Sequence, residues 1–183
     1  MIYMFLAEGF EEIEALCPLD LMRRAGLSVT TVGIGGEYIT GAHAITVRAD
    51  LTDRDFYAHS AQNETEMVFL PGGMPGTLNL GASEVVGDAI RSAYEDGKYI
   101  AAICAAPSIL GKMGLLLGKN AICYPGFEAQ LEGATISDER VVLDGNILTA
   151  AGMGAALDMG IEIVRIFCGD EKANALRSAV IAD

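Results

Sequence analysis

One cysteine stands where a strand-like run gives way to a helix-like run. Cys104 follows the apolar segment 99–103 and precedes Ala105, Ala106 and Pro107. A thiol at such a turn lies near the free amides and the positive dipole end of the next helix, which stabilise a thiolate. We therefore expect a thiol pKa lowered from about 8.5 into the range of about 4–7, as in a nucleophile. Taken alone, the pattern fits a small buried side chain better, because unpaired cysteines are among the most buried residues.

Two other segments could act on the same sulfur. Gly72 and Gly73 follow the strand-like run 66–70, and Glu14 lies one turn into the first predicted helix. Backbone amides without side chains could hold an oxyanion, although a plain turn explains the two glycines better when they are taken alone. A carboxyl group beside a thiolate has its pKa raised by burial and by the like charge. Glu14 could therefore keep its proton and donate a hydrogen bond or shuttle that proton.

The other polar residues near these segments suggest no reaction. Glu11 and Glu12 are predicted to be solvated acids at a helix start, and spacing alone predicts the same for Glu14. His43 and His59 are predicted to lie on the surface. A cysteine–histidine dyad therefore lacks its base. No nucleophile elbow of the Gly-x-Ser-x-Gly type, no phosphate-binding loop and no zinc-type cysteine spacing is present. Residue spacing leaves the reaction class open.

Apolar runs and amphipathic segments alternate along the chain. Strands are predicted over 2–7, 28–34, 66–70, 99–103 and 120–124, hairpins over 37–48 and 135–149, helices over 11–25, 83–97, 106–113, 154–167 and 170–181, and irregular chain over 50–63. This alternation predicts the α/β class, with a mostly parallel sheet and helices on both faces. Reactive groups gather at the carboxyl ends of parallel strands, so we expect Glu14, Gly72 and Cys104 at one edge.

Composition narrows the class of protein. With 183 residues, 51% of them hydrophobic, and no repeat, the chain is expected to form a single domain over 1–183. A formal net charge of -13 disfavours a nucleic-acid ligand. The N-terminal run 1–7 lacks the basic start of a signal peptide, and no apolar run is long enough to cross a membrane. We expect a cytoplasmic protein that uses neither nucleic acid nor membrane.

Several motifs, in a fixed order, resemble the PfpI/ThiJ superfamily, in the branch of the parkinsonism-associated deglycase and its small bacterial relatives. The matching segments are 7–14, 20–26, 70–76, 79–80, 101–107, 124–125 and 148–154. The resemblance implies a flavodoxin-like three-layer sandwich that forms a homodimer. It also implies that Cys104 is a reactive thiol on a strained elbow, with Glu14 as its protonated partner and Gly72 and Gly73 near the sulfur.

The resemblance also suggests substrate-binding positions. Many members have histidine where this chain has Tyr124, and some have arginine where it has His43, while Arg24 matches that arginine's partner. We assign Ala105, Arg24, His43 and Tyr124 to substrate binding. Because Tyr124 cannot serve as an imidazole base, a cysteine–histidine route is disfavoured.

The leading hypothesis is a glyoxalase or deglycase that acts on glyoxal, methylglyoxal or their adducts without glutathione. Cys104 would attack the aldehyde carbon, Glu14 would move a proton between the adjacent carbons, and water would release a hydroxy acid. The amides of Gly72 and Gly73 would hold the oxyanion, and neither metal nor organic cofactor is required. The alternatives are a redox sensor or chaperone-like protein that uses the same thiol and, ranked last, a PfpI-like cysteine peptidase.

Overall fold

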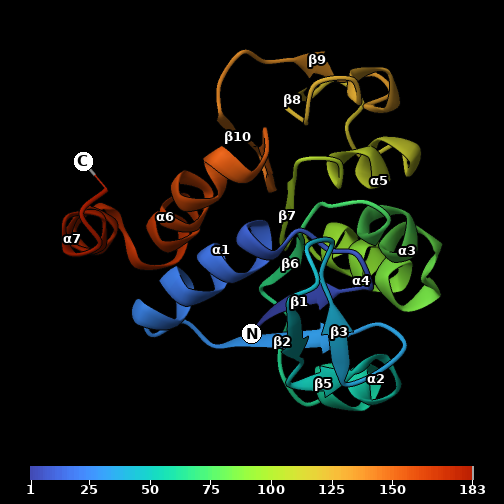
Figure 1. The fold of residues 1–183 in the computed structure, drawn as a ribbon. Helices are drawn as coiled ribbons and strands as arrows, with labels where there is room; N and C mark the ends of the chain where they lie inside the picture. Colours follow the sequence, from blue (N-terminus) through green and yellow to red (C-terminus); the bar gives the residue numbers. More distant parts are fainter. Residues whose placement is uncertain (183) are drawn as a thin grey trace.

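A seven-stranded sheet forms the centre of the molecule (Figure 1). The structure is a computed structural model that describes residues 1–182. The strands of this sheet are β1 (Ile2–Leu6), β2 (Val29–Gly33), β5 (Leu51–Thr52), β6 (Met67–Leu70), β7 (Tyr99–Ile103), β10 (Val141–Asp144) and β11 (Ile147–Ala150). Their order across the sheet is β10-β11-β7-β6-β1-β2-β5, and every neighbouring pair is parallel except β10 with β11.

Helices cover both faces of this sheet. The helices are α1 (Glu12–Arg24), α2 (Asp53–Ser60), α3 (Gly76–Ala82), α4 (Glu84–Glu95), α5 (Pro107–Lys112), α6 (Ala156–Cys168) and α7 (Asp170–Ala179), with 3-10 turns η1 (Glu128–Gln130) and η2 (Met153–Ala155). Helices α1 and α6 pack side by side on one face, α7 packs against α6, and α2 to α5 lie on the other side (Figure 1). The predicted flavodoxin-like α/β sandwich is confirmed.

The strands are apolar throughout because both of their faces are covered. In β1, Ile2, Met4 and Leu6 pack in the cluster under α1 and α6. Tyr3 and Phe5, which alternate with them, pack in the cluster under α2 to α5. A strand with one face in water would instead alternate apolar with polar residues. Because successive side chains of β1 point to opposite faces of the sheet, the strand contributes to both hydrophobic cores.

Some predicted elements differ from the structure. The segment 50–63, predicted to be irregular, contains β5 and α2, since α2 buries only Phe56 and therefore lacks an apolar stripe. The prediction missed α3, which contains two glycines and seven residues. The hairpin over 37–48 is present as β3 (Tyr38–Thr40) and β4 (Thr46–Arg48), but it forms its own sheet. The expected strand over 120–124 shrinks to β8 (Asn120–Ala121), paired with β9 (Thr135–Ile136).

The topology brings three chain segments to one edge. Strands β1, β6 and β7 are adjacent and parallel, so their carboxyl ends point the same way. The loop into α1 follows β1, Gly72 follows β6, and Cys104 follows β7 directly. Within residues 1–182, no helix combines the length and the apolar character that crossing a membrane requires.

Candidate active site at the carboxyl edge of the sheet

Cys104 occupies a strained backbone position at the end of β7. Its φ is 64°, in the left-handed region that non-glycine residues seldom adopt. The Cys104 amide donates to the Ala150 carbonyl at 2.9 Å, and the Cys104 carbonyl accepts from the Tyr124 amide at 2.8 Å. Both backbone groups are therefore held by neighbouring chain segments. Strain of this kind, at about 1–3 kcal/mol, persists where the surroundings fix it, and it concentrates at functional sites.

Glu14 reaches the sulfur from the first turn of α1. Its carboxyl group is hydrogen-bonded to Cys104, and Oε2 accepts the Gly72 amide at 3.0 Å. The residue is 1% exposed. Glu11 fixes the helix start, because its Oε2 accepts the Glu14 amide at 2.7 Å. Glu11 is thus the N-cap of α1 and not simply a solvated acid, which corrects our prediction.

Gly72 fits between the carboxyl group and the sulfur because it has no side chain. A Cβ at this position would lie 2.5 Å from Glu14 Oε2 and 2.7 Å from Cys104 Cβ. Contacts this short are not tolerated in a packed interior without movement of the neighbouring groups. The glycine therefore allows Cys104 and Glu14 to meet.

Replacing Gly72 with alanine is expected to destabilise the fold by about 1–3 kcal/mol and to disrupt the Cys104–Glu14 contact, because the new methyl group must displace one of them. Urea unfolding and the rate of Cys104 alkylation measure the two effects. Gly36→Ala is the matched control, since no atom lies within 4 Å of the added Cβ. Unchanged stability and unchanged alkylation in Gly72→Ala would contradict this description.

The amides near the sulfur differ from those that we predicted. The Gly73 and Ala105 amides hydrogen-bond to Cys104 Sγ, whereas the Gly72 amide is engaged by Glu14. Ala105 is 2% exposed and follows the sulfur directly. The structure thus brings Cys104, Glu14, Gly72, Gly73 and Ala105 together, but only two of the three amides face the sulfur.

The protonation of Glu14 and Cys104 is coupled through their contact. Burial, helped by the negative charge of Glu11, raises the pKa of Glu14 to about 7. Burial, followed by the charge and the hydrogen bond of an ionised Glu14, raises the pKa of the Cys104 thiol to about 12, although the amides of Gly73 and Ala105 act in the opposite direction. The expected lowering of the Cys104 pKa is therefore wrong, because burial and Glu14 outweigh the amides at the start of α5, a helix of only six residues.

The charge on Glu14 decides which form the sulfur takes. At pH values below about 7, Glu14 is mostly protonated, and the charge that opposes a thiolate is absent. A protonated carboxyl group donates to Sγ instead of accepting from it. When Glu14 is protonated, the amides of Gly73 and Ala105 favour a negative charge on the sulfur.

Glu12 and His43 form a second contact beside this site. Glu12 is 2% exposed, and its carboxylate accepts the His43 amide at 2.7 Å and the His43 Nδ1 group at 2.8 Å. Burial alone would raise the pKa of Glu12, but these hydrogen bonds outweigh it and lower the pKa. The same contact raises the pKa of His43. Glu12 is thus buried and holds the loop between β3 and β4 through these hydrogen bonds, whereas we predicted that Glu12 is a solvated acid.

Of the remaining predicted residues, Tyr124 lies near Cys104 and Arg24 lies far from it. Tyr124 lies beside the elbow, and a Cβ on Gly152 would lie 3.2 Å from Tyr124 Cδ2. Arg24 lies in the last turn of α1, where its Nε donates to Asp20 at 2.6 Å. Ten residues of helix separate Arg24 from Glu14, a rise of about 15 Å. Within one chain the structure does not bring Arg24 to the thiol.

A contact that sequence reasoning missed comes from η2. The Met153 amide hydrogen-bonds to Glu14, and Gly152 places this turn close to the carboxyl group. Tyr124, Gly152 and Met153 also line a mostly apolar hollow of about 390 Å³ next to the site. In the sequence, the glycine-rich segment 148–154 marks this turn. The segment contributed to the family resemblance but did not predict a contact with Glu14.

Comparison with known proteins shows which family the chain belongs to. The profile of the DJ-1/PfpI family matches residues 1–166, and thus includes every segment that meets at Cys104. The chain belongs to the DJ-1/PfpI family. Among relatives of this DJ-1/PfpI protein, protein dj-1beta of Drosophila melanogaster is 36% identical over 179 residues, which cover 96% of this chain and 94% of the relative. The glutathione-independent glyoxalase DJR-1.2 of Caenorhabditis elegans is 30% identical over 171 residues, covering 92% and 89% of the two chains.

Solved structures share the fold of this DJ-1/PfpI protein. Drosophila melanogaster DJ-1beta superimposes with a TM-score of 0.90 at 35% identity and covers 98% of this chain and 96% of its own. Oxidised Toxoplasma gondii DJ-1 superimposes with a TM-score of 0.91 at 27% identity and covers 98% and 97%.

Proposed function

We propose that this protein is a cysteine-dependent glyoxalase or deglycase that converts small 2-oxoaldehydes, or the adducts they form, without glutathione. The observation that carries the proposal is the buried pair of Cys104 and Glu14. Their side chains share a hydrogen bond, and the pKa of Glu14 is raised to about 7. A carboxyl group that titrates near neutral pH is suited to both giving and taking protons. The name of the Caenorhabditis elegans relative supports this reaction class.

The first chemical step forms a bond between sulfur and carbon. The Cys104 thiolate attacks the aldehyde carbon of methylglyoxal, and protonated Glu14 gives its proton to the developing alkoxide. The product is a hemithioacetal beside an ionised Glu14. The amides of Gly73 and Ala105 stabilise negative charge next to the sulfur throughout this step.

The later steps return the enzyme to its starting state. Glu14 removes the proton from the former aldehyde carbon and delivers it to the adjacent carbon, which turns the hemithioacetal into a hydroxyacyl thioester. Water then cleaves the thioester to the 2-hydroxy acid and the thiol, and the thiol proton passes back to Glu14. The net reaction adds one water to the oxoaldehyde, so it needs no oxidant or reductant.

The surroundings suit a small substrate. The apolar hollow beside Tyr124 and Met153 could receive the methyl end of an oxoaldehyde. His43 is exposed beside Glu12, in the first turn of α1, and carries positive charge when protonated. We retain Tyr124, His43 and Ala105 as proposed substrate-binding residues. Arg24 could contribute only from the second subunit of the homodimer that the family resemblance implies, which sedimentation equilibrium of the full chain would test.

The pH dependence of turnover tests this assignment. Because the reactive form has a Cys104 thiolate beside a protonated Glu14, the pair must first lose one proton, so kcat/KM for methylglyoxal should rise as the pH rises through about 7. Steady-state rates without glutathione, with NMR detection of the 2-hydroxy acid, provide the measurement. In D2O, the fraction of product with deuterium at carbon 2 measures how far the proton on Glu14 exchanges with solvent before it is delivered. The absence of a hydroxy acid product, or a rate that falls through this pH range, would contradict the proposal.

The same thiol supports a second candidate, a redox sensor. Cys104 is half-buried, so solvent and small oxidants can reach it. The Gly73 and Ala105 amides could hold the oxygens of a sulfinate. Mass spectrometry after mild peroxide treatment would detect a gain of two oxygens confined to Cys104. That gain, without aldehyde turnover, would favour the sensor. A peptidase lacks support, because His43 is bound to Glu12 and His59 to Tyr3.

A further inference from the structure

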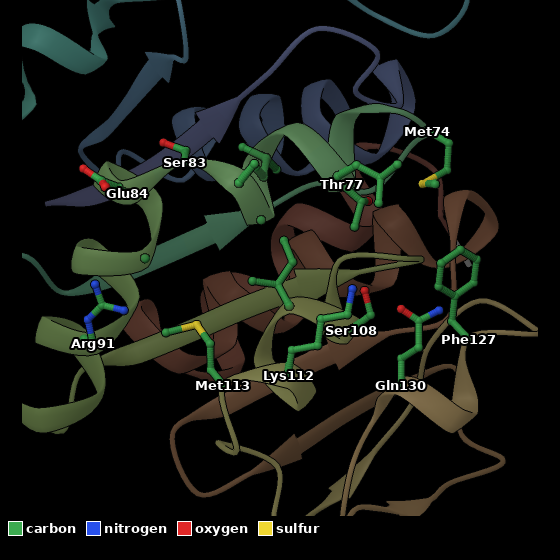
Figure 2. A pocket seen from close by; sticks show the side chains of 16 residues that line it. Met74, Thr77, Ser83, Glu84, Arg91, Ser108, Lys112, Met113, Phe127 and Gln130 are labelled. Carbon is green, nitrogen blue, oxygen red and sulfur yellow. The ribbon is translucent and has the colours of Figure 1, made fainter.

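A second pocket lies between α3, α4 and α5 (Figure 2). Its volume is about 700 Å³, within the range that small-molecule sites occupy. Neither Cys104 nor Glu14 lines it. The proposed reaction therefore leaves this pocket without a role.

One part of the pocket is apolar. Side chains of Met74, Leu78, Ile109, Met113 and Phe127 line it. These residues come from four separate segments, and Met74 and Leu78 are 47% and 55% exposed. An apolar molecule that covered them would remove this surface from water, which is favourable in proportion to the area covered.

The polar part contains two buried hydroxyl groups, one of which lacks a hydrogen-bond partner. Thr77 is 3% exposed, and its hydroxyl has no hydrogen-bond partner among the described residues. Ser108, on α5, is 2% exposed and also lines the pocket. Buried hydroxyl groups are normally paired, so an unpaired one in a pocket wall indicates a ligand or water in the occupied state.

Lys112 supplies a positive charge to this pocket. Lys98 and Lys119 pair with Glu64 and Asp144, but Lys112 has no such partner within residues 1–182. In Figure 2 the polar ends of Lys112, Ser108 and Gln130 reach from one wall towards the side where Thr77 and Met74 lie. A lysine near two hydroxyl groups and an amide matches one anionic head group.

The other cation of the pocket is already neutralised. Arg91 donates to Asp88 at 2.5 Å, and Glu84 lines the pocket on the same helix. A second negative charge on the ligand would therefore meet Glu84 without a free cation. One lysine also suits a carboxylate better than a phosphate, which usually binds through several cations or amides.

We propose that this pocket binds a small amphipathic monocarboxylate, with its carboxylate at Lys112, Ser108 and Thr77 and its apolar chain against Met74, Ile109 and Met113. The site is distinct from the thiol, and it does not depend on the aldehyde reaction. Loss of aldehyde turnover in a Cys104 variant would leave this binding unchanged.

Methyl NMR of the full chain tests the proposal, with octanoate as the probe below its micelle concentration. Saturable shifts are expected at the methyl groups of Met74 and Met113. Lys112→Met should weaken octanoate binding about fivefold or more, whereas Lys172→Met, on the exposed surface of α7, should leave it unchanged. The neutral probe 1-octanol should bind more weakly than octanoate to the unmodified protein.

A blocking variant separates occupancy of the pocket from general surface binding. A Cβ on Gly81 would meet only the Ile109 side chain, at 3.5 Å, so a larger residue fits the fold and projects into the pocket. Gly81→Met should therefore retain the folded spectrum and lose the octanoate shifts. Absent or non-saturable shifts, or binding that survives both Lys112→Met and Gly81→Met, would overturn the proposal.

Discussion

Replacing Cys104 with serine is expected to lower the turnover of methylglyoxal at least about 1000-fold while the fold stays intact. A serine hydroxyl ionises far less readily than a thiol, so the attacking group is lost although the shape of the side chain is nearly kept. The elbow itself is fixed by backbone hydrogen bonds to Ala150 and Tyr124, which do not involve the sulfur. Steady-state assays without glutathione and circular dichroism measure the two properties.

Cys168→Ser is the matched control for this experiment. Cys168 ends α6, is also half-buried, and lies outside the site, so its replacement should leave turnover unchanged. Full turnover in Cys104→Ser would mean that the sulfur is not the nucleophile. Equal loss in both variants would point to a general effect on the fold.

Replacing Glu14 with glutamine is expected to lower turnover by about 100-fold to 10,000-fold and, at the same time, to stabilise the protein at alkaline pH. The amide cannot carry the proton between carbon atoms. Stability changes because the pKa of Glu14 is raised from 4.5 to about 7 in the folded state. Between these values the folded state binds more protons than the unfolded state, so stability falls as the pH rises, by roughly 3 kcal/mol in total.

The pH therefore determines the size of the stabilising effect. Above about pH 8, Glu14→Gln should gain up to about 3 kcal/mol in the free energy of unfolding by urea, whereas near pH 4 the gain should vanish. Glu132→Gln provides a control, because Glu132 is exposed and is not one of the site residues. A variant that is less stable than the parent at pH 8, or one that keeps full turnover, would contradict the assigned role.

Most of the central sheet could be predicted from the sequence. Strands β1, β6 and β7 are buried on both faces, and their uninterrupted apolar runs identified them. Helix α2 was missed because it lies on the surface and buries only Phe56, so its sequence is polar on almost every side. Helix α3 was missed because Gly76 and Gly81 reduce its helix propensity.

The candidate site was predictable as a meeting of segments, but not in its details. Parallel strands place Glu14, Gly72 and Cys104 at one edge, and the sequence showed that each follows or faces a strand end. The N-cap role of Glu11 could have been inferred from its spacing of three residues from Glu14. Burial of Glu12 was not visible, because it depends on a loop 31 residues away in sequence. Arg24 was assigned from a motif match, which carries no information about distance along α1.

The central claim is that Glu14 holds a proton and donates it in a hydrogen bond to the Cys104 thiolate. The pH dependence of Cys104 alkylation tests it most directly, in the parent protein, Glu14→Gln and Glu14→Leu. A donating carboxyl group stabilises the thiolate, an amide does so less, and leucine not at all, so the alkylation midpoint should rise in that order. A midpoint that falls in both variants would show that Glu14 acts as a carboxylate that opposes the thiolate, and would contradict the claim.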